Sequence, residues 1–407
     1  MRKGFVKISF RYSVDKIFHL RYYKPCGLKI LGLKPDSINI RKRGSANLNA
    51  ARPQVSVIVL NWNGADDTIE CLESVLKIDY DNFSVVLVDN DSKDDSISRI
   101  KSWASGVDTN ITTSFPDLVF PKVDKPLQLT EIILRKDMTL EECIKSVSPD
   151  SIQGRTLILV KNYENAGFAI ANNLGIEMSR ILFESEYFFI LNNDTVIERD
   201  CLTCLVDEME SDKNNGAATS AVYLYSEPER IANTGGRITF FGSRKYYCGP
   251  IRDDVKKVTF VTGCALLMRN SVLEKVGLFS SRFFFGEEDF EFCWRVKTNK
   301  IPLVCVTSSR VYHKVGISAE KLMTGHIRKK FFYIFNRVID MKHNLSSTTW
   351  QFWRFFLLVY SFLWLTSKHN VKIPTALKFI LEMRRYTTEY DDARRYTIET
   401  ITQKLSF

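Results

Sequence analysis

The segment QVSVIVLNWNGADDTIECLESVL, residues 54–76, decides the fold. Its first part is a continuous apolar run that ends in Asn and Gly, the pattern of a buried strand followed by a turn. Its second part carries apolar residues at helical spacing. The same alternation returns in FSVVLVDNDS (83–92) and DDSISRIKSWA (94–104). We therefore predict a β-α-β-α start and a parallel sheet with loops at the carboxyl ends of its strands.

Two further strand-helix units follow along the chain. The third is TLILVKNYENAGF (156–168) with AIANNLGIEMSRIL (169–182), and the fourth is YFFILNNDT (187–195) with RDCLTCLVDEME (199–210). Residues 105–154 lie between the second and third units and are rich in Pro, Thr, Ser and charge. Crossovers in compact α/β units are much shorter, so we interpret this stretch as an insertion with a small hairpin and the short helix TLEECIKSV.

The positive charge of the chain is concentrated in an N-terminal arm. The 407 residues carry a formal charge of +10, and residues 1–52 hold 13 Lys and Arg residues against Asp15 and Asp36. The rest of the chain is therefore close to neutral. A basic arm suits an anionic membrane surface or a polyanion, although a solvated tail would have the same composition. We divide the chain into this arm, an α/β domain at 53–322 that contains the insertion, and a helical region at 323–407.

The helical C-terminal region is basic and aromatic. Its centre, TTWQFWRFFLLVYSFLWLTS at 348–367, approaches the roughly 20 residues that cross a bilayer but contains Gln351 and Arg354. Trp350, Trp353 and Trp364 add the aromatic character of a membrane interface. Three interpretations remain open: an interfacial helix, a helix packed on the domain or a partner, and a true membrane span.

Cysteine usage and the N-terminus favour a cytoplasmic protein, peripheral on the inner face of the membrane. Nine cysteines are scattered, and the close pair Cys201 and Cys204 falls in a predicted helix rather than a zinc knuckle. The first residues alternate charged and apolar side chains, without the apolar core of a signal peptide. No export is implied.

Polar residues follow each of the four predicted strands. In an open parallel sheet, ligands bind beyond the carboxyl ends of the strands. Each residue alone could be a helix cap or a turn. Neither G-x-G-x-x-G nor a phosphate-binding loop is present, which disfavours dehydrogenases and P-loop enzymes. The remaining interpretation is a nucleotide site with a divalent cation at NND (192–194). The candidates are Asn61, Asn63, Gly64, Asp89, Asn90, Asn162, Asn165, Asn192, Asn193 and Asp194.

These motifs carry a resemblance to a known family. The strand-helix units above, VTGCALLMRNSVLEKVGLF (261–279) and FFFGEEDFEFCWR (283–295) occur in the order found in family-2 glycosyltransferases. The chain resembles this family, and most closely its rhamnosyltransferase-like branch, from residue 54 to about residue 345. The resemblance implies a GT-A fold, with a mixed, mostly parallel sheet flanked by helices and, here, a helical aromatic C-terminal extension.

The resemblance also implies a reaction. A nucleotide-diphosphate sugar, dTDP-rhamnose-like or a UDP-sugar, would donate its sugar with inversion to a hydroxyl of a glycan or lipid-linked acceptor, with Mg²⁺ or Mn²⁺. Asp89 would contact the base, and Asp194 would hold the metal with His313 of RVYHKVGIS. Asn192 departs from the family's usual Asp. The residues implied to bind the nucleotide sugar are Asn61, Asn63, Asp89, Asn90, Asn165, Gly167, Asn192 and Asn193.

The acid-rich stretch 283–295 supplies the candidate base. Gly286 breaks the chain, and acids favour a helix N-terminus, so we predict a helix from about Glu287. Phe290, Cys293 and Trp294 would then form its apolar face, with Glu291 and Arg295 as a surface ion pair. In family terms, Asp289 is the expected base and Glu288 a supporting acid.

Two other classes of protein compete with the enzyme. The first is a non-catalytic sugar-nucleotide or glycan-binding scaffold at a membrane, favoured by Asn192 and by the insertion. The second is a nucleic-acid protein, which rests only on the aromatic and basic arm. Since the C-terminal region is also aromatic and basic, we prefer a lipid partner and predict no nucleic acid.

Overall fold

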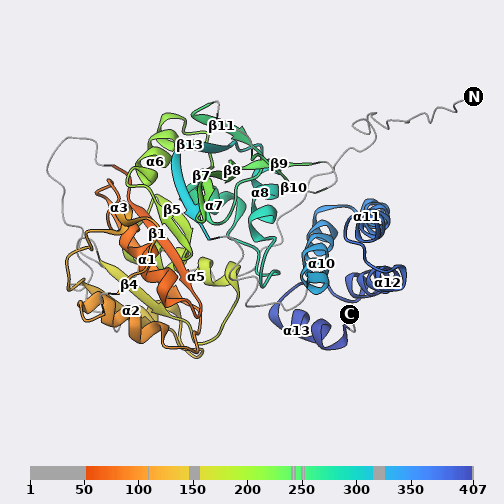
Figure 1. Ribbon diagram of the computed structural model, residues 1–407, viewed down its shortest axis with the longest axis horizontal. Coiled ribbons are helices and arrows are strands. Elements are labelled where there is room, and N and C mark those ends of the chain that lie inside the picture. Colours follow the sequence, from red (N-terminus) through yellow and green to blue (C-terminus); the bar gives the residue numbers. More distant parts are fainter. Residues whose placement is uncertain are drawn as a thin grey trace, which may run out of the picture.

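The computed structural model describes residues 52–405 with a few gaps (Figure 1). The gaps are residues 109, 146–155, 240, 241, 243, 249, 250, 252 and 315–325. The predicted basic arm at 1–52 lies outside the described residues except for Arg52.

One large mixed sheet organises the molecule. Its strand order is β11-β13-β7-β12-β5-β1-β2-β4-β3, and the pairs β5-β1, β1-β2, β2-β4 and β4-β3 are all parallel. β12 runs antiparallel to both of its neighbours, β5 and β7. Because β7 and β13 again run with β1, the sheet is mostly parallel, as predicted. The strands of this parallel half are β1 (Val55–Asn61), β2 (Phe83–Asp89), β3 (Leu129–Ile133), β4 (Leu157–Lys161) and β5 (Tyr187–Asn192).

The second half of the sheet combines parallel and antiparallel pairs. β6 pairs with β13 and β8 pairs with β7, while β9 and β10 form a separate ribbon. The strands are β6 (Thr195–Ile197), β7 (Ala217–Leu224), β8 (Glu227–Asn233), β9 (Gly236–Ile238), β10 (Arg244–Tyr246), β11 (Val255–Val258), β12 (Ala265–Arg269) and β13 (Leu303–His313).

Helices cover both faces of the sheet. Those of the α/β domain are α1 (Ala65–Val75), α2 (Ser96–Ser105), α3 (Pro116–Val119), α4 (Leu140–Lys145), α5 (Phe168–Phe183), α6 (Cys201–Ser211), α7 (Asn270–Val276) and α8 (Glu288–Thr298). α6 contains both Cys201 and Cys204, which confirms that this pair lies in a helix. All cysteines of the described residues are free thiols.

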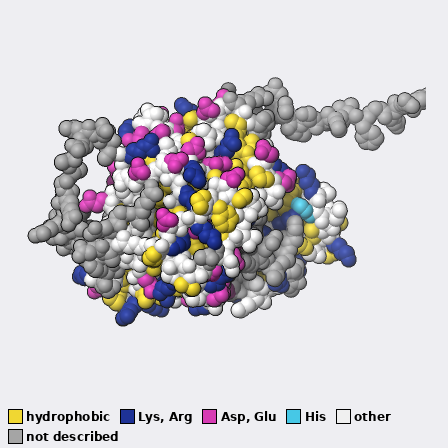
Figure 2. Space-filling model, turned by 60° about the vertical axis from the view of Figure 1, so that its left-hand side comes forward, with side chains coloured by type: hydrophobic (Ala, Val, Ile, Leu, Met, Phe, Trp, Pro, Cys, Tyr) yellow, Lys and Arg dark blue, Asp and Glu magenta, His cyan; other side chains and the backbone are white. Residues whose placement is uncertain are grey.

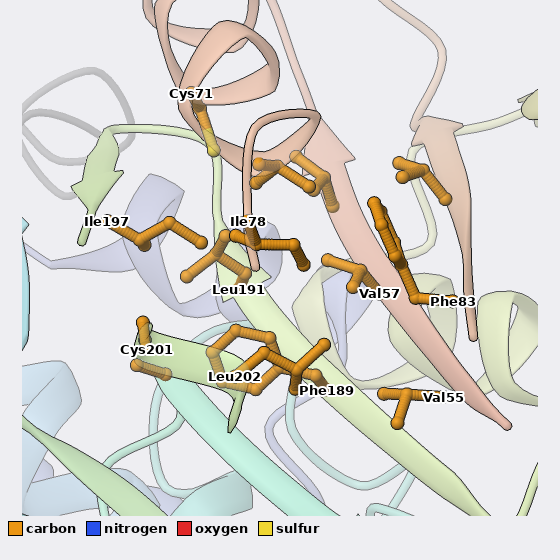
Figure 3. Close-up of a cluster of buried hydrophobic side chains, with 14 of the residues drawn as sticks. Val55, Val57, Cys71, Ile78, Phe83, Phe189, Leu191, Ile197, Cys201 and Leu202 are labelled. Atoms are coloured by element: carbon orange, nitrogen blue, oxygen red, sulfur yellow. The ribbon is translucent and has the colours of Figure 1, made fainter. Parts of the chain in front are cut away.

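The alternation of side chains along β1 divides the core in two. Val55 and Val57 point into the cluster that includes residues of α1, α2 and α6, and Figure 3 shows them with Phe189 and Leu191 of β5. Ile58 points to the other face, into the cluster that includes residues of α5 and α8. Successive side chains of a strand face opposite sides, so a continuous apolar run is what a strand covered on both faces requires.

The insertion between the second and third units contributes a strand to the main sheet. β3 lies at the edge and pairs parallel with β4, in register from Leu129 with Leu157 to Ile133 with Lys161. The predicted hairpin is therefore wrong within the described residues, whereas the short helix is confirmed as α4. A hairpin needs an antiparallel partner strand close in sequence. The strand LTEII (129–133) instead pairs with the free edge of β4.

Four helices form the C-terminal region: α10 (His326–Asn344), α11 (Ser347–Lys368), α12 (Ile373–Glu389) and α13 (Arg395–Lys404). They lie together at the side of the molecule opposite α2 (Figure 1). Phe331, Phe335, Phe379 and Tyr386 are fully buried in their shared core. Among the described helices, none combines the length and the hydropathy that crossing a bilayer demands.

The described surface of the α/β domain carries charges of both signs. On the face shown in Figure 2, Lys and Arg side chains are intermingled with Asp and Glu side chains. This pattern agrees with a body close to neutral, as the sequence outside the arm indicated.

Candidate active site

The polar residues after β1 and β2 meet at one edge of the sheet. The Asn61 side-chain amide donates to Asp89 Oδ2 at 2.7 Å, and the Ser92 hydroxyl donates to the same oxygen at 2.6 Å. The Ser92 backbone N–H donates to Asp89 Oδ1 at 3.0 Å. Asn61 and Asp89 are 0% and 1% exposed. The Asp89 carboxyl therefore fixes the two loops against each other, whatever else it contacts.

The turn after β1 contains a residue whose backbone is in the left-handed conformation. Asn63 has φ of 50°, its backbone N–H donates to Ser92 Oγ at 2.9 Å, and its side-chain oxygen accepts from the Lys93 N–H at 2.7 Å. Asn is one of the few residues other than Gly that tolerates this conformation. The Asn61–Gly64 turn is thus bound to the β2 loop by backbone and side-chain hydrogen bonds.

A second polar cluster joins the ends of β2 and β4. The Asn90 side-chain amide donates to Asn165 Oδ1 at 2.8 Å, and Asn90 Oδ1 accepts from the Asn162 side chain and from the Ala166 N–H, both at 3.1 Å. Asn165 Oδ1 also accepts from the Gly167 N–H at 3.0 Å. The structure therefore brings together all the residues predicted at these two strand ends.

Gly167 is required where it stands. It has φ of 83°, and a Cβ atom added to it would lie 2.3 Å from the backbone oxygen of Phe284. That same oxygen accepts from the Phe168 N–H at 2.9 Å. The loop before α5 and the acid-rich stretch are thus in direct backbone contact, which only a residue without a side chain permits.

The end of β5 and the end of β13 form the third cluster. Asp194 Oδ1 lies 3.1 Å from His313 Nε2, and Asn192 Nδ2 lies 3.4 Å from the same nitrogen. Burial lowers the pKa of His313, but Cys264 and Asp194 outweigh it and raise the pKa to about 10. Burial opposes ionisation of Asp194, yet His313 lowers its pKa below the usual value. Asn193 instead turns toward α1 and donates to Thr68 Oγ1 at 2.9 Å.

The third cluster fits a cation that substrate oxygens would help to hold. Asn192 Oδ1 is buried and has no hydrogen-bond partner within the described residues, and Asp194 is 4% exposed. No group of three His, Cys, Asp or Glu side chains with metal-binding geometry occurs among residues that the structure describes. Mg²⁺ and similar cations bind through one or two carboxylates together with phosphate oxygens and water. Asp194 and the Asn192 amide oxygen are suitable donors for such a site, and His313 becomes one when its Nε2 proton is released on metal binding.

The dipeptide Gly263-Cys264 connects this cluster to the acid motif. The Cys264 carbonyl accepts from the Asn192 N–H at 3.0 Å, and the Gly263 N–H donates to Asp289 Oδ2 at 3.3 Å. A Cβ atom on Gly263 would lie 3.5 Å from that of Asp289 and 3.8 Å from the Phe168 ring. Segments separated by about 100 residues of sequence therefore meet around one small residue.

The acid motif begins helix α8, one residue later than predicted. Asp289 is 8% exposed, and its Oδ1 accepts from the Phe290 N–H at 2.7 Å and lies 3.5 Å from Arg244 Nη1. Glu288 is buried, and its Oε2 has no hydrogen-bond partner within the described residues. Burial, followed by the charge of Asp289, raises the pKa of Glu288 to about 8. One helix turn thus offers two carboxyl groups in different environments.

Glu287 has a structural role that is separate from those of Glu288 and Asp289. Its φ of 90° is unusual for a residue with a side chain. Its carboxylate pairs with Arg337 of α10 and with Arg244, whose Nη2 lies 2.8 Å from Glu287 Oε2. Asn336 donates to the carbonyl oxygens of Phe285 at 2.8 Å and of Gly286 at 3.1 Å. Helix α10 therefore holds the chain directly before the acid motif.

The other side chains of α8 follow the predicted helical spacing with one correction. Phe290 and Cys293 are fully buried, and Trp294 is partly buried. Arg295 forms the predicted bidentate pair with Glu291, at 2.8 and 2.7 Å. The pair is not on the surface as predicted, because Glu291 is 4% exposed and Arg295 also donates to the carbonyl oxygens of Gly277 and Leu278.

Several residues of the site were not singled out from the sequence. Ser92, three residues after Asp89, has the spacing of an Asx turn and could have been found. Gly263 and Cys264 belong to a quoted motif but had no role. Arg244 and Asn336 had no sequence signal, because their contacts depend on tertiary structure alone.

The fold defines an α/β protein with a candidate ligand site at the carboxyl ends of its parallel strands, where the order of connections reverses at β1. Two family models match the sequence: glycosyl transferase family 2 over residues 56–113, and glycosyl transferase family group 2 over residues 187–383. These ranges together take in more than half of the chain. Two segments of the chain therefore match models of family-2 glycosyltransferases.

Solved structures give more distant similarities. The chain is 16% identical to the mannosyltransferase PcManGT from Pyrobaculum calidifontis, in complex with GDP-Man and Mn²⁺, over 87% of this chain and 80% of that one (TM-score 0.46). It is 13% identical to GalNAc-T7 with UDP, GalNAc and Mn²⁺, over 82% of this chain and 55% of that one (TM-score 0.47). It is 14% identical to S. aureus TarS 1-349, over 87% and 93% (TM-score 0.44). No curated protein matches the sequence.

Proposed function

We propose that this protein transfers a sugar, with inversion, from a nucleotide-diphosphate sugar to a hydroxyl of a glycan or lipid-linked acceptor. The observation that carries the proposal is the contact of Gly263-Cys264 with both Asn192 and Asp289. It sets the candidate cation site and the candidate base on either side of one short backbone segment. An in-line displacement needs these two groups on opposite faces of the sugar.

Asp289 is the proposed general base. Its carboxyl oxygens are oriented by the Phe290 and Gly263 N–H groups, and the side chain retains some exposure to solvent. A carboxylate held within hydrogen-bond reach of an acceptor hydroxyl can remove the proton as the hydroxyl oxygen attacks the anomeric carbon. Glu288, with its pKa raised to about 8, is protonated at neutral pH and can donate a hydrogen bond to the acceptor.

The donor would lie across the ends of β1, β2 and β4. The Asn61–Gly64 turn, Asp89 and Asn90 would hold the nucleoside, with Asn165 and Gly167 beside the sugar. Asp194, His313 and Asn192 would hold Mg²⁺ or Mn²⁺, which supplies positive charge to the diphosphate leaving group when bound. The half-exposed rings of Tyr333, which lies beside Gly286, and of Tyr246, whose hydroxyl accepts from Arg244, would provide a surface for the acceptor.

The donor sugar belongs to the proposal too. The motif resemblance to the rhamnosyltransferase-like branch favours dTDP-rhamnose or a UDP-sugar. A panel of nucleotide sugars incubated with the full chain and Mn²⁺ tests both class and donor, with released nucleoside diphosphate as the readout. We expect release from one donor, and its loss in Asp289→Asn. If every donor binds by calorimetry and none is turned over with any acceptor offered, the chain is a non-catalytic scaffold instead.

A further inference from the structure

Helix α11 has an apolar face that the rest of the described chain leaves uncovered. Its exposed apolar side chains recur at i, i+3, i+4, i+7, i+8 and i+11, so they form one stripe along the helix. They are Phe352, Phe355, Phe356, Val359, Tyr360 and Leu363, each between 44% and 63% exposed. An apolar stripe of this length on a folded surface marks a contact with another phase or molecule.

Helix α12 extends the same kind of surface. Ile373, Leu377 and Leu381 are spaced four residues apart and are 50% to 65% exposed. On both helices the opposite face is buried against the C-terminal core, through Leu358 and Leu365 of α11 and Phe379 and Met383 of α12. The uncovered faces therefore belong to a folded unit, and they do not come from helices that lack packing partners.

The charges around these stripes determine the kind of partner. α11 contains no Asp or Glu, and residues 326–389 hold eleven Lys and Arg residues against Asp340, Glu382 and Glu389. Lys368, Lys372 and Lys378 are exposed at the junction of the two helices. Apolar side chains bordered by cations match the interface of an anionic bilayer, in which apolar residues enter the acyl boundary and Lys meets the phosphates.

The same charges disfavour two other occupants of this face. A second copy would bring another set of lysines against these, and like charges in an interface are repelled. The N-terminal arm, with 13 Lys and Arg residues against two acids, has the same sign as the face. A phospholipid surface is the occupant that satisfies both the apolar stripe and the cations.

We propose that the exposed faces of α11 and α12 form a membrane-docking surface for anionic phospholipids, lying in the interface rather than crossing it. This inference concerns a surface outside the proposed active site and does not depend on the sugar transferred. α11 and α12 lie at the end of the molecule opposite α2, so docking leaves most of the α/β domain away from the bilayer (Figure 1).

Vesicle co-sedimentation of the full chain tests the surface. The probes are phosphatidylcholine vesicles with and without phosphatidylglycerol, at low and high salt. Phe352→Ser with Phe356→Ser removes apolar contacts and should weaken binding to the anionic vesicles by roughly tenfold or more. Lys368→Gln and Lys372→Gln should each weaken it by about fivefold and reduce its salt dependence. The matched control is Val107→Ser, which changes an apolar residue that is 80% exposed on the α/β domain.

Three outcomes would overturn the proposal. The first is wild-type binding in the Phe and Lys variants, which would assign lipid binding to the N-terminal arm. The second is a wild-type dimer, by sedimentation velocity, that the Phe variant dissociates. The third is the absence of binding to either vesicle. Donor hydrolysis in solution should be equal in the wild type and in all these variants. If no donor is hydrolysed, that result counts against the proposed enzyme and not against the membrane surface.

Discussion

Arg337 of α10 is paired with Glu287, the residue directly before helix α8 of the α/β domain, with Arg337 Nη2 3.3 Å from Glu287 Oε2. The Glu287 side chain is buried, at 2% exposed, and the Arg337 side chain is mostly covered, at 14% exposed. The C-terminal helices are therefore part of the candidate active site, because they hold the left-handed backbone that introduces Glu288 and Asp289. Removing the C-terminal helices would therefore also remove a contact that holds Glu288 and Asp289 in position.

Replacing Arg337 tests whether its ion pair with Glu287 holds the acid motif in place. Arg337→Met leaves Arg244 as the remaining ion-pair partner of Glu287. We therefore expect a loss of roughly 1–3 kcal/mol in the free energy of unfolding. We also expect kcat to fall by a larger factor than the KM for the donor rises. Arg337→Lys should restore part of kcat because it keeps the charge. The control is Arg385→Met, on an exposed side chain, with less than about 0.5 kcal/mol expected. Equal losses of stability and of kcat in Arg337→Met and Arg385→Met would argue against this role of the Arg337–Glu287 ion pair.

Asp289→Asn tests the proposed base. The amide cannot accept the acceptor proton, so we expect turnover to fall by about 10² to 10⁴-fold, with donor affinity unchanged by calorimetry. Asp117→Asn, at an exposed position in the insertion, is the control. Near-wild-type turnover in the Asp289 variant would assign the proton transfer to another group.

Asp194→Ala tests the cation site. Without this carboxylate, donor binding should lose its dependence on Mn²⁺, and the difference between titrations with and without Mn²⁺ should shrink by about tenfold or more. Asp137→Ala, also exposed in the insertion, should leave both titrations unchanged. A full Mn²⁺ effect in Asp194→Ala would remove this residue from the site.

Gly167→Ala tests the close contact between the loop before α5 and Phe284. Gly277 is a matched control, because its φ and ψ of 85° and 167° nearly equal the 83° and 173° of Gly167. A Cβ atom on Gly277 would meet only Arg295 Nη1, at 3.4 Å. We expect about 1–3 kcal/mol of destabilisation from backbone strain at Gly277 and clearly more at Gly167, by urea unfolding. Similar losses at both glycines would mean that the Phe284 contact relaxes freely.

Glu288 predicts how stability depends on pH. Its pKa in the folded protein is raised to about 8 from its usual value of 4.5, so the folded state holds the proton more tightly than the unfolded chain does. The stabilising contribution is complete below about pH 4.5 and is lost as the pH rises toward 8 and above. Glu288→Gln cannot ionise, so its unfolding free energy should exceed that of the wild type at pH 8 to 9.

The same comparison at pH 4.5 is the control for Glu288→Gln. There the carboxyl group and the amide are both neutral in the folded protein, so the difference between variant and wild type should be smallest. A difference that stays constant from pH 4.5 to 9 would show that Glu288 ionises normally in the folded state.

The sequence predicted the features that depend on local pattern. The apolar run of β1 and the helical spacing of α1 gave the parallel start of the sheet, and polar residues at four strand ends gave the place of the site. The reason is physical: a strand buried on both faces must be apolar, and parallel strands bring their carboxyl ends to one edge.

Tertiary structure alone decided how distant segments complete the site. Nothing in LTEII indicated that β3 would pair with β4, and nothing in α10 indicated that Asn336 and Arg337 would hold the backbone before α8. Ala393, near the end of the chain, pairs with the backbone of Phe283 and Phe284, and Phe284 in turn contacts Gly167. Such contacts are set by packing between elements far apart in sequence, where local periodicity carries no information.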